Sequence, residues 1–128
     1  MKRKVLISFF AILLILAIFL SGCCLLENLS ADVVITKWEQ DYSGGKWSDQ
    51  AKVYYTITNT GNAEIGFYNI WFAIYCEDGS IWEDFSVIGL SVEVGQTKSR
   101  TCWIDIGSNE KVISIEVTNL KLDHFPNQ

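Results

Sequence analysis

Apolar and polar side chains alternate along most of the chain after residue 30. The clearest example is the segment 50–60, where one face carries only apolar and aromatic residues. These are Ala51, Val53, Tyr55 and Ile57. A period of two over this length is typical of a β-strand with one face in a hydrophobic core. Turn-forming residues follow from Asn59 to Asn62 and indicate where the strand ends.

Five further segments have the length and composition of β-strands. They are 31–38, 67–77, 81–94, 97–106 and 111–122. The segment 67–77 is apolar on both faces, which indicates a central strand or one that a loop covers. Asp78-Gly79 and Gly95-Gln96 are predicted turns. No helical periodicity follows residue 30, so we predict an all-β domain, an antiparallel Ig-like sandwich of about six to seven strands.

The beginning of the chain has a different pattern. Met1 to Lys4 is positively charged, and 5–20 is apolar except for Ser8. A charged start, an apolar run and small residues at its exit predict an N-terminal hydrophobic signal helix. Leu20-Ser21-Gly22-Cys23 resembles the lipobox of prokaryotic lipoproteins.

That resemblance implies a signal peptide over 1–22, which is removed, and a lipid on the sulfur of Cys23. The chain would then be exported and anchored to the outer face of the cell membrane, or to an outer membrane where one is present. Two alternatives remain at this point. The 16 apolar residues would rise about 24 Å as a helix, against about 30 Å for a bilayer crossing, so an uncleaved anchor is one alternative. An ordinary secretory signal is the other.

Behind the signal we expect a short tether over 23–30, the sandwich over 31–123 and a polar tail over 124–128. The seven residues after Cys23 reach at most about 25 Å when extended. The domain is therefore expected close to the membrane. Apolar side chains in the tether could enter the membrane interface or pack under the edge of the domain; they are Leu25, Leu26 and Leu29.

Charge excludes one class of partner. The part of the chain from Cys23 onward has seven basic residues against 15 acidic ones, a net charge of −8. Such a surface repels nucleic acid and anionic lipid head groups, so we predict no nucleic-acid partner. The membrane is predicted as a partner through the lipid on Cys23 alone.

Two cysteines fall within predicted strands. Cys76 and Cys102 are both on inward-facing positions, which makes them a disulfide candidate in an exported protein. The alternative is two separate buried thiols. We predict no metal and no cofactor, because the chain has no Cys-x-x-Cys motif and a single histidine, His124. Acidic residues near one turn lack the Asp-x-Asp-x-Asp-Gly spacing of a calcium loop; they are Asp78, Glu83 and Asp84.

The same residue content argues against catalysis. Nucleophilic triads need an oriented histidine, and His124 lies beyond the last predicted strand. Paired glycosidase carboxylates need a cleft, which a sandwich of this size seldom provides. We therefore predict that the protein is not an enzyme and has no catalytic residues.

The predicted strands also carry a family resemblance. The stretch 53–61 is similar to the strand and Asn-x-Gly turn that open many Ig-like extracellular domains. Residues 72–75, followed by Glu77-Asp78-Gly79, resemble the motif of the FxLYD domain, with Ile74 at the leucine position. Residues 94–97 resemble the glycine-containing turn before that family's next strand.

The FxLYD likeness covers roughly residues 33 to 120 and departs at Cys76, where the family has an aspartate. It implies a β-sandwich of the kind found on surface lipoproteins, with no catalytic residues to carry over. The water-stress and hypersensitive-response type of sandwich is the alternative family.

Tryptophan content suggests where the domain binds. Four of its five tryptophans lie in a polar loop, after a turn or on faces opposite the predicted core; they are Trp47, Trp82, Trp71 and Trp103. Exposed aromatics of this kind anchor protein partners or stack on sugars. The alternative is that they only cover the sheets. We expect a non-enzymatic protein-interaction or envelope-assembly module, and, as the alternative, a surface-tethered carbohydrate-binding module that holds a polysaccharide.

Overall fold

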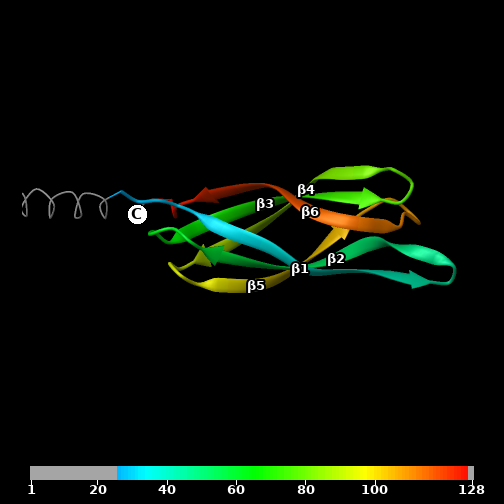
Figure 1. The fold of residues 1–128 in the computed structure, drawn as a ribbon, viewed down its shortest axis with the longest axis horizontal. Coiled ribbons are helices and arrows are strands. Elements are labelled where there is room, and N and C mark those ends of the chain that lie inside the picture. The colour runs from blue at the N-terminus through cyan, green and yellow to red at the C-terminus, as the bar shows by residue number, and fades with distance from the viewer. Residues whose placement is uncertain (1–25, 127–128) are drawn as a thin grey trace, which may run out of the picture.

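The computed structural model describes residues 26–126, which form six β-strands (Figure 1). The strands are β1 Ala31–Ser43, β2 Lys46–Asn59, β3 Ile65–Cys76, β4 Ile81–Val92, β5 Thr97–Asp105 and β6 Val112–Asp123. This confirms the predicted all-β class. The predicted signal peptide 1–22 and Cys23 lie outside the described residues.

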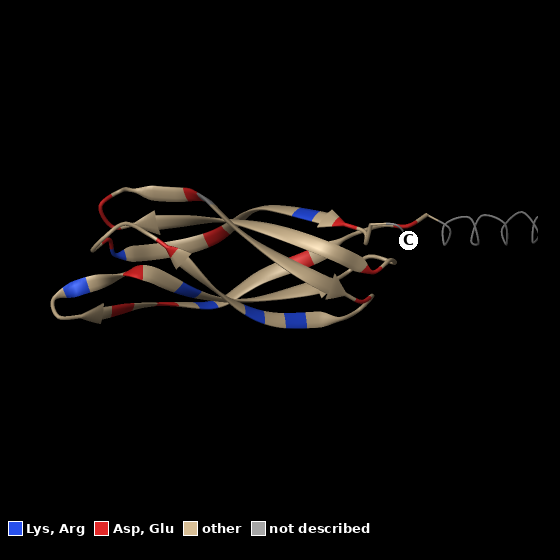
Figure 2. Cartoon of the chain, turned by 180° about the vertical axis from the view of Figure 1, so that it is seen from behind, with Lys and Arg blue, Asp and Glu red and all other residues tan. Residues whose placement is uncertain are grey.

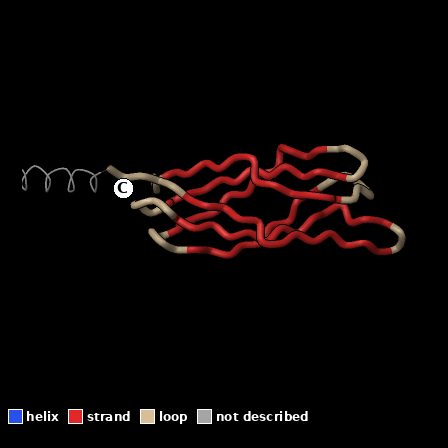
Figure 3. Tube along the Cα trace, viewed as in Figure 1, coloured by secondary structure: helices blue, strands red, loops and turns tan. Residues whose placement is uncertain are grey.

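The strands form two antiparallel sheets that face each other as a sandwich (Figure 3). One sheet has the order β1-β2-β5 and the other the order β4-β3-β6. β3 is thus a central strand, as its two-sided apolar pattern predicts. Among residues 26–126, no helix has the length and apolar character that a membrane crossing requires.

The core fills the space between the inner faces of the two sheets. On β2 every second side chain is buried, from Ala51 to Asn59, so the predicted register is confirmed. In the middle of the core, the hydroxyls of Tyr55 and Tyr68 are 3.1 Å apart and join the two sheets. The ring of Tyr68 lies against Gly89, where a Cβ would be 1.8 Å from its Cζ. β4 runs through Gly89, whose missing side chain leaves room for this ring.

The two ends of the sandwich are formed by different turns and segments. We call one end the tip; it is formed by the hairpin turn at 44–45, the turn at 77–80 and the loop at 106–111 (Figure 1). We call the other end the base; it is formed by the segment 26–30, the loop 60–64, the turn 93–96 and the C-terminal segment 124–126. Both described ends of the chain are at the base.

At the base, residues 26–30 are packed on the domain. The N–H groups of Thr60 and Gly61 donate to the carbonyl of Ser30 over 2.9 and 3.2 Å. Leu29 packs against the core cluster. The part of the tether that the structure describes is thus held in place, and the alternative in which its leucines pack under the domain's edge holds for Leu29.

The basic residues are unevenly distributed (Figure 2). Five of the seven in the described chain belong to the sheet β1-β2-β5; they are Lys37, Lys46, Lys52, Lys98 and Arg100. Lys111 is the basic residue of the loop that leads into β6, and acidic residues surround it at the tip. The turns and loops at both ends of the domain therefore carry more acidic than basic residues.

Candidate functional site

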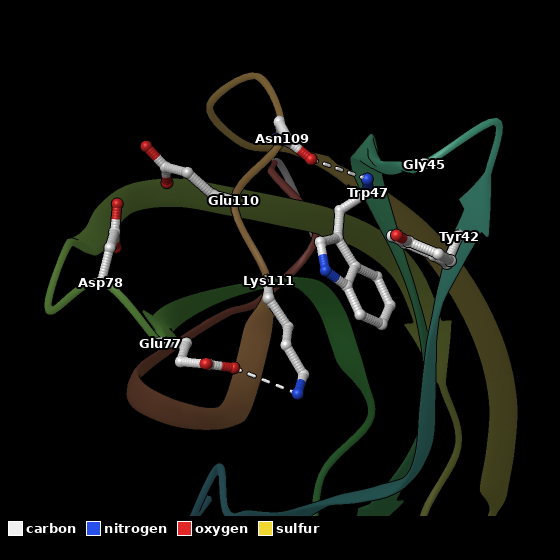
Figure 4. A pocket seen from close by; sticks show the side chains of 8 residues that line it. All are labelled: Tyr42, Gly45, Trp47, Glu77, Asp78, Asn109, Glu110 and Lys111. Carbon is white, nitrogen blue, oxygen red and sulfur yellow. Dashed lines mark hydrogen bonds and ion pairs between the residues drawn. The ribbon is translucent and has the colours of Figure 1, made fainter.

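The tip contains an open hollow of about 610 Å³ (Figure 4). It is lined by residues from the hairpin, the turn after β3 and the loop before β6; they are Tyr42, Gly45, Trp47, Glu77, Asp78, Asn109, Glu110 and Lys111. Segments far apart in the sequence thus contribute side chains to one place.

The hairpin between β1 and β2 provides the aromatic wall. Tyr42 and Trp47 are directly paired across the two strands, and their ring centroids are 4.7 Å apart. Gly44 and Gly45 both have positive φ, which this tight turn needs and which glycine adopts without strain. β2 begins at Lys46, so the prediction that Trp47 belongs to a loop was wrong: the strands extend into the polar hairpin.

The loop before β6 is fastened to this hairpin by amide groups. Asn109 Oδ1 accepts a hydrogen bond of 3.0 Å from the backbone N–H of Trp47. Gln40 Nε2 donates to the carbonyls of Ser48 and Glu110, over 2.8 and 2.6 Å. Gln40 Oε1 also accepts from the N–H of Val112 over 2.9 Å. These bonds fix the loop relative to the aromatic wall.

Lys111 lies between the aromatic wall and the turn after β3 (Figure 4). Its Nζ is 3.0 Å from Glu77 Oε2 and 5.6 Å from the centroid of the Trp47 ring. An ammonium at this distance from an indole gains a cation–π attraction. The wall of the hollow therefore already holds one cationic group of the chain itself.

Two further carboxylates line the other side of the hollow. Asp78 Oδ1 accepts hydrogen bonds from the hydroxyl and the N–H of Ser80, and these bonds lower the pKa of Asp78 below its ordinary value. Glu110 Oε2 accepts from the indole N–H of Trp82 over 2.7 Å and lies 3.0 Å from Ser80 Oγ, whose single proton it shares with Asp78. The carboxylate of Asp78 is thus charged at neutral pH.

The charges of the hollow do not balance. Glu77 and Lys111 neutralise each other, which leaves the carboxylates of Asp78 and Glu110 without a basic partner in the hollow's lining. The hollow therefore has the chemistry to attract a cation and to accept hydrogen bonds, next to an aromatic wall.

Cys76 is buried behind these carboxylates, and its sulfur, Asp78 and Glu110 offer ligand atoms within 4.8 Å of one another. Burial raises the pKa of the Cys76 thiol. The carboxylates already accept bonds from Ser80 and Trp82, so the described chain itself provides their donors. His124, the one histidine of the chain, is at the base and pairs with Glu27, so it has no access to this thiol.

The structure brings together two of the four predicted binding tryptophans. Trp82 donates to Glu110, and the ring of Trp47 faces Lys111, so both contact the same loop at the tip. Trp103 lies on the outer face of β5, where Lys52 Nζ is 5.2 Å from its ring. Trp71 is on β3, in the opposite sheet, and is half-buried. Neither belongs to the hollow.

The two strand cysteines are free in the structure, in place of the predicted disulfide. Both are buried, as predicted, but they belong to β3 and β5 in opposite sheets. Disulfides do join the two sheets of Ig-like sandwiches, so membership of opposite sheets does not by itself separate the two thiols. Cys76 is at the end of β3, beside Val112, whereas Cys102 is paired with Val53 inside its sheet.

Sequence patterns missed the part of the hollow that the loop before β6 contributes. Asn109, Glu110 and Lys111 have no distinguishing motif. Gly107-Ser108-Asn109 is a turn signal, and Asn109 has a positive φ of 59°. This signal predicts a loop but not its contact with Trp47, which is 62 residues away.

Comparisons with known proteins give little further information. No family model matches the chain, and no curated protein matches it. Among solved structures, the X-ray structure of Northeast Structural Genomics Consortium target SoR45 is similar at a TM-score of 0.40 and 12% identity, over 79% of this chain and 88% of that chain.

Proposed function

We propose that this protein is a lipid-anchored extracytoplasmic module that binds a partner through the hollow at its tip and catalyses no reaction. The FxLYD-like and lipobox-like motifs support a surface lipoprotein. The observation that carries the proposal is the position of the hollow, at the end of the sandwich opposite to both described ends of the chain.

A lipid anchor at the base and a binding hollow at the tip are compatible with one orientation of the domain on the membrane. Cys23 precedes the base by only a few residues, so a lipid on its sulfur holds the base near the membrane. β2 alone has 14 residues, and at about 3.3 Å per residue it extends about 45 Å from base to tip. The hollow then faces away from the membrane, where a partner has access to it.

The chemistry of the hollow indicates the partner's contact group. The carboxylates of Asp78 and Glu110 attract a cation, and Trp47 and Tyr42 provide an aromatic wall. A lysine or arginine side chain of a protein fits both features, because its charge pairs with the carboxylates of Asp78 and Glu110 while its apolar stem packs on the aromatic rings.

Pull-down from detergent-solubilised membranes tests this function. The bait is the full chain with a C-terminal tag, which is at the base and leaves the tip free. We expect reproducible capture by the wild type and loss of capture in Trp47→Ala and in Asp78→Asn/Glu110→Gln. Trp103→Ala is the matched control, because this exposed tryptophan is on the outer face of a sheet. Capture that survives in Trp47→Ala would contradict the role of the hollow.

The lipid is tested separately by intact mass. The wild type should carry a diacylglycerol and partition into detergent, and Cys23→Ala should lose both properties. A wild-type chain with the mass of its unmodified sequence would instead support an uncleaved anchor.

A carbohydrate-binding module is the second candidate, because the pair Tyr42–Trp47 beside carboxylates and the Asn109 amide also suits a sugar ring. Titration with cell-wall polysaccharides distinguishes the two functions. A saturable change in tryptophan fluorescence that Trp47→Phe alters and Trp103→Phe does not would favour the sugar, and no response across a broad panel would exclude it.

A further inference from the structure

One asparagine at the base holds the N-terminal segment through both its backbone and its side chain. Asn62 Oδ1 accepts from the N–H of Asn28 over 2.6 Å, and the N–H of Asn62 donates to the carbonyl of Asn28 over 3.1 Å. Asn62 Nδ2 donates to the carbonyl of Leu26 over 2.7 Å. Three hydrogen bonds thus join one loop residue to the first described residues of the chain.

A second group of contacts extends this attachment toward β1. The carbonyl of Ser30 accepts from the N–H groups of Thr60 and Gly61, and the hydroxyls of Ser30 and Thr60 are 2.8 Å apart. Gly61 permits the close approach, because a Cβ there would be 2.1 Å from the carbonyl oxygen of Asn28. The segment is therefore docked in a fixed position along the loop 60–64.

The C-terminal segment 124–126 also packs against the base. His124 Nε2 is 3.7 Å from Glu27 Oε2. Phe125 passes over Gly66, where a Cβ would be 2.3 Å from the Phe125 nitrogen, and its ring is 5.8 Å from that of Phe67. Both ends of the described chain are thus packed into the base.

The docked segment leaves little chain between the domain and the lipid. Leu26 follows Cys23 by three positions, with two residues between them, so the reach from Cys23 to Leu26 is at most about 11 Å. Two apolar side chains are exposed at the base: Leu26 is 75% exposed and Val94 is 55% exposed. Val94 belongs to the turn 93–96, which is bonded to Asn59 at the end of β2.

We infer that the segment 26–30 is a rigid mount that seats the base of the sandwich on the lipid surface, and is not a flexible linker. The inference rests on the proposed lipid at Cys23. Because the chain between Cys23 and Leu26 is so short, a lipid on Cys23 places the membrane surface against the exposed side chains of Leu26 and Val94. Glu27, Glu64 and Glu93 surround this end, so head groups without net negative charge suit it.

Glu27 provides a direct test, because a protease that cuts after glutamate can release the domain from a vesicle. Such cleavage requires the docked segment to open, so its rate reports the population of the open state. With the lipidated full chain in phosphatidylcholine vesicles, we expect release from Asn62→Ala to be about tenfold faster than from the wild type. Asn119→Ala is the matched control, because Asn119 Oδ1 accepts only a local bond from the N–H of Leu120.

The outcomes separate the two proposals. Wild-type release as fast as that of Asn62→Ala, from a chain whose mass includes the lipid, would overturn the mount and leave the anchor intact. A chain of unmodified mass that the vesicles do not retain would overturn the anchor, and the lipid seat with it.

Contact with the lipid surface has its own measurement. Vesicles of brominated phosphatidylcholine quench tryptophans that reach the bilayer. We expect the added tryptophan of Leu26→Trp and of Val94→Trp to be quenched, and that of Ile81→Trp, an exposed position next to the turn at the tip, to be unaffected. Equal quenching of all three would contradict the proposed orientation.

Discussion

The indole N–H of Trp82 donates a hydrogen bond of 2.7 Å to Oε2 of Glu110 and thereby joins the start of β4 to the loop before β6. The same oxygen lies 3.0 Å from Ser80 Oγ, whose single proton it shares with Asp78. Two segments of the tip are thus connected through one carboxylate, and the position of Glu110 in the hollow depends on both donors.

Removing the indole donor should weaken this connection. Trp82→Phe keeps an aromatic ring but loses the N–H, and we expect the free energy of unfolding to fall by about 1 kcal/mol. Urea unfolding followed by circular dichroism measures the change. Trp103→Phe should change it by less than about 0.5 kcal/mol. Equal effects of the two substitutions would show that the Trp82 hydrogen bond does not stabilise the fold.

The hydroxyl pair in the core is a second stability test. Tyr68→Phe leaves the buried Tyr55 hydroxyl without its partner. We expect a loss of about 1–3 kcal/mol of unfolding free energy, and a smaller loss than the sum of the single changes when Tyr55→Phe is added. Tyr42→Phe, at an exposed position, is the control. Additive effects would contradict coupling between the two hydroxyls.

The same pair predicts a dependence of stability on alkaline pH. Burial and the hydrogen bond with Tyr68 raise the pKa of Tyr55 well above its ordinary value. An acid with a raised pKa in the folded state holds its proton more tightly there. Its stabilising contribution is thus complete below about pH 10, the pKa of an unfolded tyrosine, and is lost as pH rises further. Unfolding free energies at pH 9 and pH 11 should differ more in the wild type than in Tyr55→Phe.

The two strand cysteines should react slowly with thiol reagents, because they are free but buried. Burial raises the pKa of Cys102 to about 11 and also raises that of Cys76. With Cys24→Ser in the full chain, we expect slow labelling of both thiols by a disulfide reagent at pH 8 and fast labelling of two thiols in denaturant. A mass about 2 Da lower before reduction than after it would instead show a disulfide between them.

Asn59 is a buried polar residue whose side-chain amide has hydrogen-bond partners for both its nitrogen and its oxygen. Its Nδ2 donates to the carbonyls of Ala63 and Val92, over 2.8 and 2.9 Å, and its Oδ1 accepts from the N–H of Gly61. Asn59→Asp replaces both donors with an acceptor. We expect a loss of about 3 kcal/mol or more in unfolding free energy.

The control for Asn59→Asp is Asn119→Asp, at an exposed position on β6. A stability of Asn59→Asp close to that of the control at neutral pH would contradict the proposed role of the amide donors. Loss that disappears on acidification would identify the buried carboxylate charge as its cause.

The sequence predicts those features that follow from side-chain alternation. The inward faces of β2 and β5 and the central place of β3 are confirmed, because a half-buried strand has a period of two. The extension of β1 and β2 into the hairpin was missed, since the residues 39–43 and 46–49 are mostly polar and give no alternating pattern. Trp47 moves from a predicted loop into a strand for this reason.

Of the predicted binding tryptophans, Trp47 lines the hollow and Trp82 lies beside it, bonded to Glu110. Trp47 and Trp82 share one loop of the tip, whereas Trp71 and Trp103 are in opposite sheets. The order of the strands in the two sheets decides which tryptophans lie near each other. That order depends on strand pairings between distant residues, such as Trp103 with Lys52, which are 51 positions apart. Packing of the tether under the domain's edge was one of two predicted alternatives, but the bonds that hold 26–30 were not predicted, because they join backbone groups to Asn62 and backbone groups have no sequence signal.

Gly44 and Gly45 close the hairpin at the tip, and β1 runs from there directly to the base. A partner that pulls on the tip, against an anchor beyond Leu26, therefore applies tension along β1. A strand is already nearly fully extended at about 3.3 Å per residue, and hydrogen bonds to β2 along its length share the force. The domain would transmit a pulling force between partner and anchor with little elongation.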